Sequence, residues 1–173
     1  MKTTILIASI IMATLPTLSI ADEISITDTG ITFDAPADFI KLSDDLISKK
    51  WPSNRAPAWA VSTETGSTTI AYDLKPNDIS NAPFDQLLST FETMFERVIP
   101  GIEWIDRKVI EIDDKEWIFL EMTSSAIDTD IHNIMLATSY GADMLVFNFN
   151  STVEEFASYE AELRKSIDSI ELP

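Results

Sequence analysis

The sequence contains no cysteine and only one histidine, His132, among its 173 residues. Without cysteine there can be no disulfide, no thiolate nucleophile and no cysteine-based zinc or iron–sulfur site. A single histidine cannot supply the usual set of zinc ligands, and no G-x-S-x-G motif accompanies it to indicate a serine hydrolase. These absences leave packing as the source of stability, and we expect no catalytic residue, no metal site and no cofactor.

Basic side chains are also scarce. Twelve Lys and Arg residues stand against 29 Asp and Glu residues, for a formal net charge of −17. So acidic a surface disfavours nucleic acid and anionic lipid, because both are bound by neutralising their phosphates. Two interpretations of the acidity stay open: it complements a basic protein partner, or it serves solubility alone.

Long hydrophobic runs are absent except near the start of the chain. The run between Lys2 and Pro16 is too short to span a bilayer comfortably. With the small-residue ending at Ala21, it has the layout of a cleavable secretory signal. We therefore expect residues 1–21 to be a signal peptide and residues 22–173 to be one exported domain, periplasmic or secreted, without membrane insertion. Removing Lys2 with the signal takes the formal charge to −18.

The expected mature chain shows several strand patterns. Residues 24–34, 59–74 and 131–149 each alternate around a turn and predict a hairpin. Residues 102–112 predict a strand with a bulge, since their alternation slips by one residue. Residues 117–122 are apolar at nearly every position, which is typical of a strand buried on both faces.

Helical patterns lie between and after these strands. Apolar residues within 84–98 recur at helical spacing and predict an amphipathic helix. A capping box at 152–155 opens a second main helix, residues 43–50 predict a turn or two of helix, and residues 169–172 predict a short edge strand. The predicted fold class is α+β, an α/β/α sandwich with a mainly antiparallel sheet of six to seven strands and two main helices.

Three phrases carry a resemblance to a known family: Gly30–Phe39, Val109–Trp117 and Leu163–Ile170. With the order of elements, they resemble the PsbP-like family, which includes the PsbP extrinsic protein of photosystem II, a Ran-binding import factor, the DcrB lipoproteins and adaptor proteins of type VI secretion. Asp114 stands where these proteins usually have glycine. The resemblance implies a domain that binds other proteins or supports assemblies, and it supplies no catalytic residue.

The predicted partner-binding site is the loop from Lys49 to Trp59. It gathers Lys49, Lys50 and Arg55 beside Trp51 and Trp59. Tryptophan and arginine are enriched where interfaces concentrate their binding energy. Alternatively, the two indoles only cover the open end of the sheet while the lysines are solvated.

Acidic residues suggest two other kinds of site. Asp128 and Asp130 resemble a fragment of a calcium loop but lack its glycine and closing glutamate, and turn chemistry also explains them. We expect His132 to be a polar or edge-strand residue. A cleft shared by Glu121, Asp128, Asp130 and His132 would instead indicate an enzyme.

These observations favour a non-enzymatic protein of the bacterial envelope that binds another protein as an accessory, assembly or immunity factor; the partner is basic if the acidity serves binding. An immunity protein of this kind would cover a basic effector by charge complementarity. The alternative is a periplasmic module that binds a small ligand or calcium, with the ligand held between the sheet and the helix at 84–98.

Overall fold

The computed structural model describes residues 21–51, 56–126 and 129–173. Residues 1–20 of the predicted signal peptide, Arg55 of the predicted site and Asp128 of the calcium-loop fragment lie outside the described residues.

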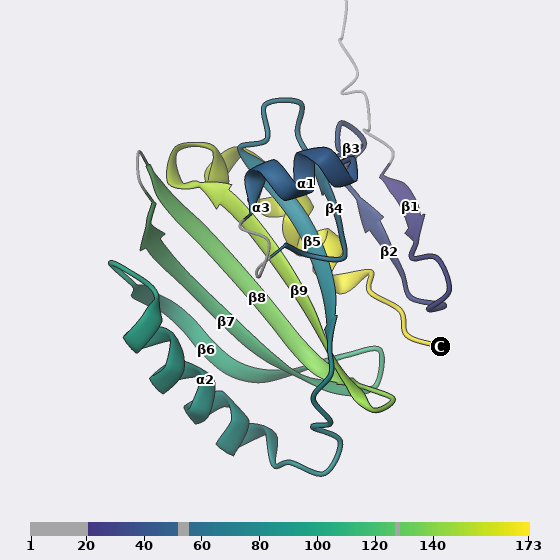
Figure 1. The fold of residues 1–173 in the computed structure, drawn as a ribbon, viewed down its shortest axis with the longest axis vertical. Coiled ribbons are helices and arrows are strands. Elements are labelled where there is room, and N and C mark those ends of the chain that lie inside the picture. The colour runs from purple at the N-terminus through teal and green to yellow at the C-terminus, as the bar shows by residue number, and fades with distance from the viewer. Residues whose placement is uncertain (1–20, 52–55, 127–128) are drawn as a thin grey trace, which may run out of the picture.

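A seven-stranded antiparallel sheet forms the centre of the molecule (Figure 1). Its strands are β3 (Ile40–Lys41), β4 (Trp59–Ser62), β5 (Thr68–Lys75), β6 (Glu103–Ile112), β7 (Lys115–Ser125), β8 (Asp130–Tyr140) and β9 (Asp143–Thr152). They lie side by side in the order β3-β4-β5-β9-β8-β7-β6. The predicted α+β class is therefore confirmed.

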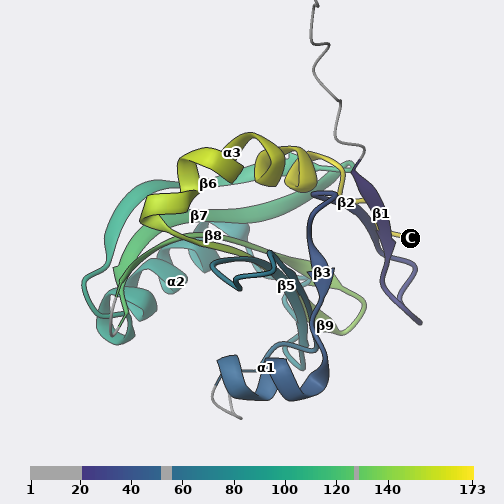
Figure 2. The ribbon, with the colours of Figure 1, turned by 90° about the horizontal axis from the view of Figure 1, so that it is seen from above.

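Among the residues that the structure describes, three helices cover the two faces of this sheet: α1 (Asp44–Lys50), α2 (Phe84–Val98) and α3 (Val153–Asp168). Ser43 caps α1 by accepting a hydrogen bond from the Leu46 N–H at 3.4 Å, and Thr152 caps α3 by accepting one from the Glu155 N–H at 3.3 Å. Figure 2 shows α3 on one face and α1 and α2 on the other. No helix among the described residues is long and apolar enough to cross a membrane.

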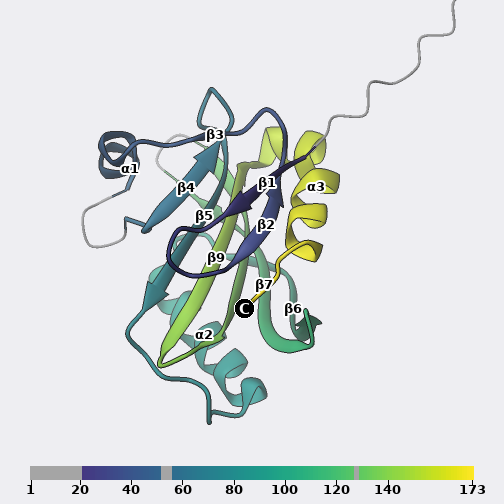
Figure 3. The ribbon, with the colours of Figure 1, turned by 90° about the vertical axis from the view of Figure 1, so that its right-hand side faces the viewer.

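The first predicted hairpin forms a separate two-stranded sheet from β1 (Asp22–Ser25) and β2 (Thr32–Ala35). Figure 3 shows it beside α3. The expected strand at 169–172 is reduced to a single bridge, in which Glu171 exchanges two backbone hydrogen bonds with Thr32. The prediction is wrong in extent because this segment joins β2 for one residue pair only, and not the large sheet.

The turns of the sheet follow the sequence predictions. The predicted bulge in β6 lies between Trp104 and Asp106. Asp113 and Asp114 connect β6 to β7 with φ angles of 51° and 56°, in the left-handed region. Aspartate tolerates this region better than most residues with a side chain, which explains how the chain turns here without a glycine.

The α3 side of the sheet holds the largest hydrophobic cluster. Trp117, Phe147 and Phe149 are fully buried there. Phe156 and Leu163 of α3 pack onto them. This cluster also takes in residues of the small sheet, so the small sheet and the large sheet share one core.

The opposite face carries two smaller clusters. Ile118 and Leu120 point from β7 toward α2, whose Phe91 and Phe95 pack against them. These side chains occupy the space between α2 and the sheet, where the alternative function would have placed a ligand. Elsewhere on this face Ile47 of α1 forms a small cluster with short residues of β4 and β5.

Candidate functional site

The predicted partner-binding residues divide between the two faces of the sheet. Trp51 follows α1 and packs against the small cluster around Ile47. Trp59 begins β4 and lies on the α3 face, where its ring is 5.8 Å from that of Phe33 and 6.1 Å from that of Tyr72. The structure therefore keeps Lys49, Lys50 and Trp51 together and separates Trp59 from them.

Lys50 links α1 to the β4–β5 turn. Its ammonium donates a hydrogen bond to the Gly66 carbonyl and lies 5.3 Å from the centre of the Trp51 ring. Burial of the ammonium lowers the pKa of Lys50. Lys49 is exposed and has no such contact with a described residue. Binding of a partner by this region stays a prediction.

A buried polar network lies beneath α3. One carboxylate oxygen of Glu121 on β7 is 2.8 Å from the His132 Nε2 atom on β8 and 2.8 Å from the Arg164 Nη2 atom on α3. Glu121 is 3% exposed and His132 9%. Arg164 also donates to Glu160, one turn earlier on the same helix.

The electrostatics of this network favour a charged Arg164. Desolvation opposes the charge, but hydrogen bonds from Arg164 to Glu121 and Glu160, together with their negative charges, outweigh it and raise the pKa of the guanidinium. The network therefore compensates the buried carboxylate with a cation and ties α3 to the sheet.

The imidazole of His132 is covered by neighbouring side chains. The Phe156 ring stacks on it with 3.4 Å between the ring centres and 6° between the planes. With Glu121 at its Nε2 atom and Phe156 on its face, His132 is packed as a structural residue rather than presented at a surface. Asp130 is exposed at the start of β8, and Asp128 lies outside the described residues.

Sequence reasoning named Glu121 and His132, with Asp128 and Asp130, only as a set whose shared cleft would indicate an enzyme, and it did not single out Arg164. The signal for Arg164 was its spacing from Glu160, which places the two side chains on neighbouring turns of one helix face. That spacing does not reveal Glu121, which lies 43 residues away in the sequence.

A groove of about 500 Å³ opens beside this network, between β6 and α3. Its lining combines apolar residues with charged residues of both signs: Asp106, Lys108, Ile110, Glu111, Ile112, Phe119, Glu121, Arg164, Ile167 and Asp168. Lys108 reaches the Asp106 carboxylate at 2.6 Å and lies 5.1 Å from the centre of the Phe119 ring. The groove therefore already holds one cation between a carboxylate and an aromatic face.

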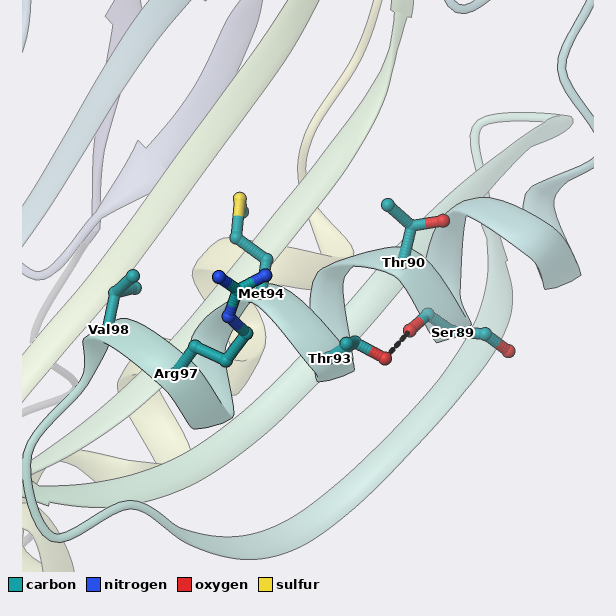
Figure 4. A pocket seen from close by; sticks show the side chains of 6 residues that line it. All are labelled: Ser89, Thr90, Thr93, Met94, Arg97 and Val98. Carbon is teal, nitrogen blue, oxygen red and sulfur yellow. Dashed lines mark hydrogen bonds between the residues drawn. The ribbon is translucent and has the colours of Figure 1, made fainter.

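A larger hollow of about 790 Å³ follows the exposed side of α2 (Figure 4). Its lining comes from α2 alone: Ser89, Thr90, Thr93, Met94, Arg97 and Val98. The three hydroxyl groups donate to carbonyls one turn earlier in the helix, such as Thr93 to Ser89 at 3.0 Å. With its hydroxyl donors used inside the helix, this hollow is a helix surface and not a built polar site.

Within 21–51, 56–126 and 129–173, no group of three His, Asp or Glu side chains is arranged to hold a metal ion. Asp130 lines a separate cavity of about 290 Å³ together with Glu103. Two carboxylates are fewer than the six to eight oxygen ligands that calcium takes.

Comparison with known proteins shows the fold. No protein-family model matches this chain, and no curated protein sequence matches it. Among solved structures, PsbP (CyanoP) of the cyanobacterium Synechocystis is similar over 93% of this chain and 98% of its own, with a TM-score of 0.60 and 12% identity. The chain therefore has a PsbP-like fold.

Two further structures support this fold. LpqN of Mycobacterium tuberculosis, described as involved in cell envelope biogenesis, is similar over 88% of this chain and 90% of its own, with a TM-score of 0.60 and 14% identity. A Pseudomonas aeruginosa protein of unknown function is similar over 88% of this chain and 96% of its own, with a TM-score of 0.55 and 13% identity.

Proposed function

We propose that this chain is an exported accessory protein of a bacterial envelope that acts by binding another protein and not by catalysis. The proposal rests on which polar side chains already have partners within the chain and which surface is left open. His132 and Arg164 both contact Glu121 beneath α3, whereas the groove between β6 and α3 is open and is lined by more acidic than basic residues.

The comparisons support the location in this proposal. A structure described as involved in envelope biogenesis matches 88% of the chain, and the N-terminal residues have the composition of an export signal. Mass spectrometry of the protein recovered from the envelope fraction should find a chain that begins after Ala21. Recovery of the intact chain from the cytoplasm would contradict export.

The acidity supports a partner that is basic. A net charge of −17 raises the association rate with a positively charged protein and repels another acidic one. An immunity factor that covers a basic effector is one form of this proposal, and an assembly factor for a basic subunit is another.

The test is capture of a partner by the affinity-tagged protein from its own organism at low salt. A partner that binds in a fixed ratio and is released as salt rises supports the proposal. Absence of any partner from both the envelope and the medium would contradict it, and calcium and small-ligand titrations would then test the alternative module.

The predicted site at Lys49, Lys50, Trp51, Arg55 and Trp59 can be tested in the same experiment. Trp51→Ala is the suitable variant, with Lys49→Glu beside it. Trp59→Ala is less suitable because Trp59 packs against Phe33 and Tyr72, so that loss of binding would also follow from loss of folding. Retained capture by Trp51→Ala and Lys49→Glu would exclude this region as the site.

A further inference from the structure

The large sheet has one short edge and one long edge. The short edge is β3, with two residues. The long edge is β6, with ten residues from Glu103 to Ile112, and β7 is its only partner among the described residues. An open edge offers backbone N–H and C=O groups to another extended chain.

The two halves of the β6 edge differ in the regularity of their backbone. The bulge between Trp104 and Asp106 disturbs its first half, and the Arg107 N–H donates to the Asp106 carboxylate at 2.8 Å. From Lys108 to Ile112 the pairing with β7 is continuous. This second half is therefore the part that can receive an added strand.

The groove between β6 and α3 lies along this same half. Residues Lys108, Ile110 and Ile112 line it from β6, and Asp168 lines it from the end of α3. Since alternate side chains of a strand point to one face, every second side chain of an added strand would face this groove.

The charges around the β6 edge favour an added strand that is basic. Both bases that line the groove are already paired with acids: Lys108 with Asp106, and Arg164 with Glu121 and Glu160. Glu111 and Asp168 form no salt bridge with any described residue. A second copy of this chain is disfavoured because its own charge is −17.

The geometry points to a specific mode of binding: an extended, basic segment of a partner protein adds to the open edge of β6, and its Lys or Arg side chains enter the groove between β6 and α3. The carboxylates left for such a cation are those of Glu111 and Asp168, because Lys108 already occupies the place between the Asp106 carboxylate and the Phe119 ring. This inference rests on the proposed protein-binding function and adds the surface and the class of partner.

The test uses a synthetic peptide of about ten residues that alternates Lys with Val or Thr, titrated against the exported protein at low salt. A second peptide of the same sequence carries N-methyl groups on the amides that would pair with β6. Methylation keeps every charge but removes the donors, and we expect it to weaken binding about tenfold or more. Hydrogen exchange should show new protection of the β6 amides with the first peptide only.

The protein variants test the charges. Glu111→Lys and Asp168→Lys should each weaken binding about two- to fivefold. Both should fold, because Glu111 lies opposite Glu116 in the β6–β7 pairing and Asp168 ends α3, where a cation suits the helix dipole. Glu64→Lys in the β4–β5 turn makes the same charge change away from the edge and should leave binding unchanged.

Equal binding of both peptides, or equal weakening by Glu64→Lys, would overturn the inference and indicate unspecific attraction to an acidic surface. The inference can also fail while the proposed function stands. If a partner captured from the organism still binds Glu111→Lys and Asp168→Lys variants as tightly as it binds the unaltered protein, the chain is a binding protein that uses another surface.

Discussion

Helices α3 and α2 have 16 and 15 residues and lie on opposite faces of the same sheet, but they are buried to different depths. Phe156, Leu163, Ser166 and Ile167 of α3 are buried, whereas none of the described residues of α2 is. Met94 and Val98 of α2 are 42% and 57% exposed. The comparison teaches that the α3 face supplies most of the stability and that α2 is a loosely attached cover.

The largest expected effect comes from the centre of the α3 face. Phe147→Ala should lower the free energy of unfolding by about 3–5 kcal/mol, because it empties the space of a fully buried ring among other aromatic side chains. Denaturant unfolding monitored by circular dichroism measures the change.

The matched substitution on the other face is Phe91→Ala in α2. Phe91 is only half-buried, so about 1–2 kcal/mol should be lost. Equal losses for Phe91→Ala and Phe147→Ala would show that the two faces contribute alike and would break the comparison.

The polar network beneath α3 gives an effect between those of Phe147→Ala and Phe91→Ala. Glu121→Ala should cost about 2–4 kcal/mol, because it leaves His132 and Arg164 without their shared acceptor. The cost stays below that of a fully buried pair because the Arg164 side chain is 39% exposed. Glu160→Ala, which removes the exposed partner of Arg164, should cost less than about 1 kcal/mol, and thermal unfolding should separate the two variants.

A substitution in the β6–β7 turn should change the stability without affecting the packing of either face. Asp114→Gly in the β6–β7 turn should stabilise the protein by about 0.5 kcal/mol, because φ is 56° at this residue and glycine adopts that region without steric cost. Asp113→Gly should gain less, since the Asp113 carboxylate accepts a hydrogen bond from the Leu172 N–H at 2.8 Å. A loss of stability in Asp114→Gly would contradict this account of the turn.

The smallest effect is a pH dependence at the N-terminal half of α3. Desolvation and a hydrogen bond to Asp38 raise the pKa of Tyr159 to about 12 from its ordinary value of 10. The folded state thus holds this proton more tightly than the unfolded state. The resulting stabilisation is complete below pH 10 and is lost as pH rises toward 12.

Tyr159→Phe should remove that part of the pH dependence. Tyrosinate absorbance during alkaline titration should lose its latest transition in the variant, while the remaining tyrosines titrate as before. A loss of absorbance change near pH 10, with the latest transition retained, would show that Tyr159 ionises like an exposed tyrosine.

Much of the fold could be predicted because its elements are set by local patterns. The bulge near Trp104 and the cap at Thr152 were both expected from neighbouring residues and are confirmed. The short strand at 169–172 was wrong in extent, because its pairing depends on Thr32, more than 130 residues away.

The candidate site was harder to predict for the same reason. Trp51 and Trp59 are close in sequence, but Trp51 follows α1 on one face of the sheet and Trp59 lies on β4 and packs into the cluster on the other face. Glu121 and Arg164 are distant in sequence and meet only when α3 folds back over β7.

The sequence by itself determined the class of fold, the acidity of the surface and the places where strands turn and helices begin, because these follow from side-chain periodicity, charge and local hydrogen bonds. Only the tertiary structure decided the depth to which each helix is buried, the partners of Glu121, and the position of β6 at an open edge. Periodicity tells which side of an element is apolar, but burial, pairing and edge position depend on contacts between residues far apart in the chain.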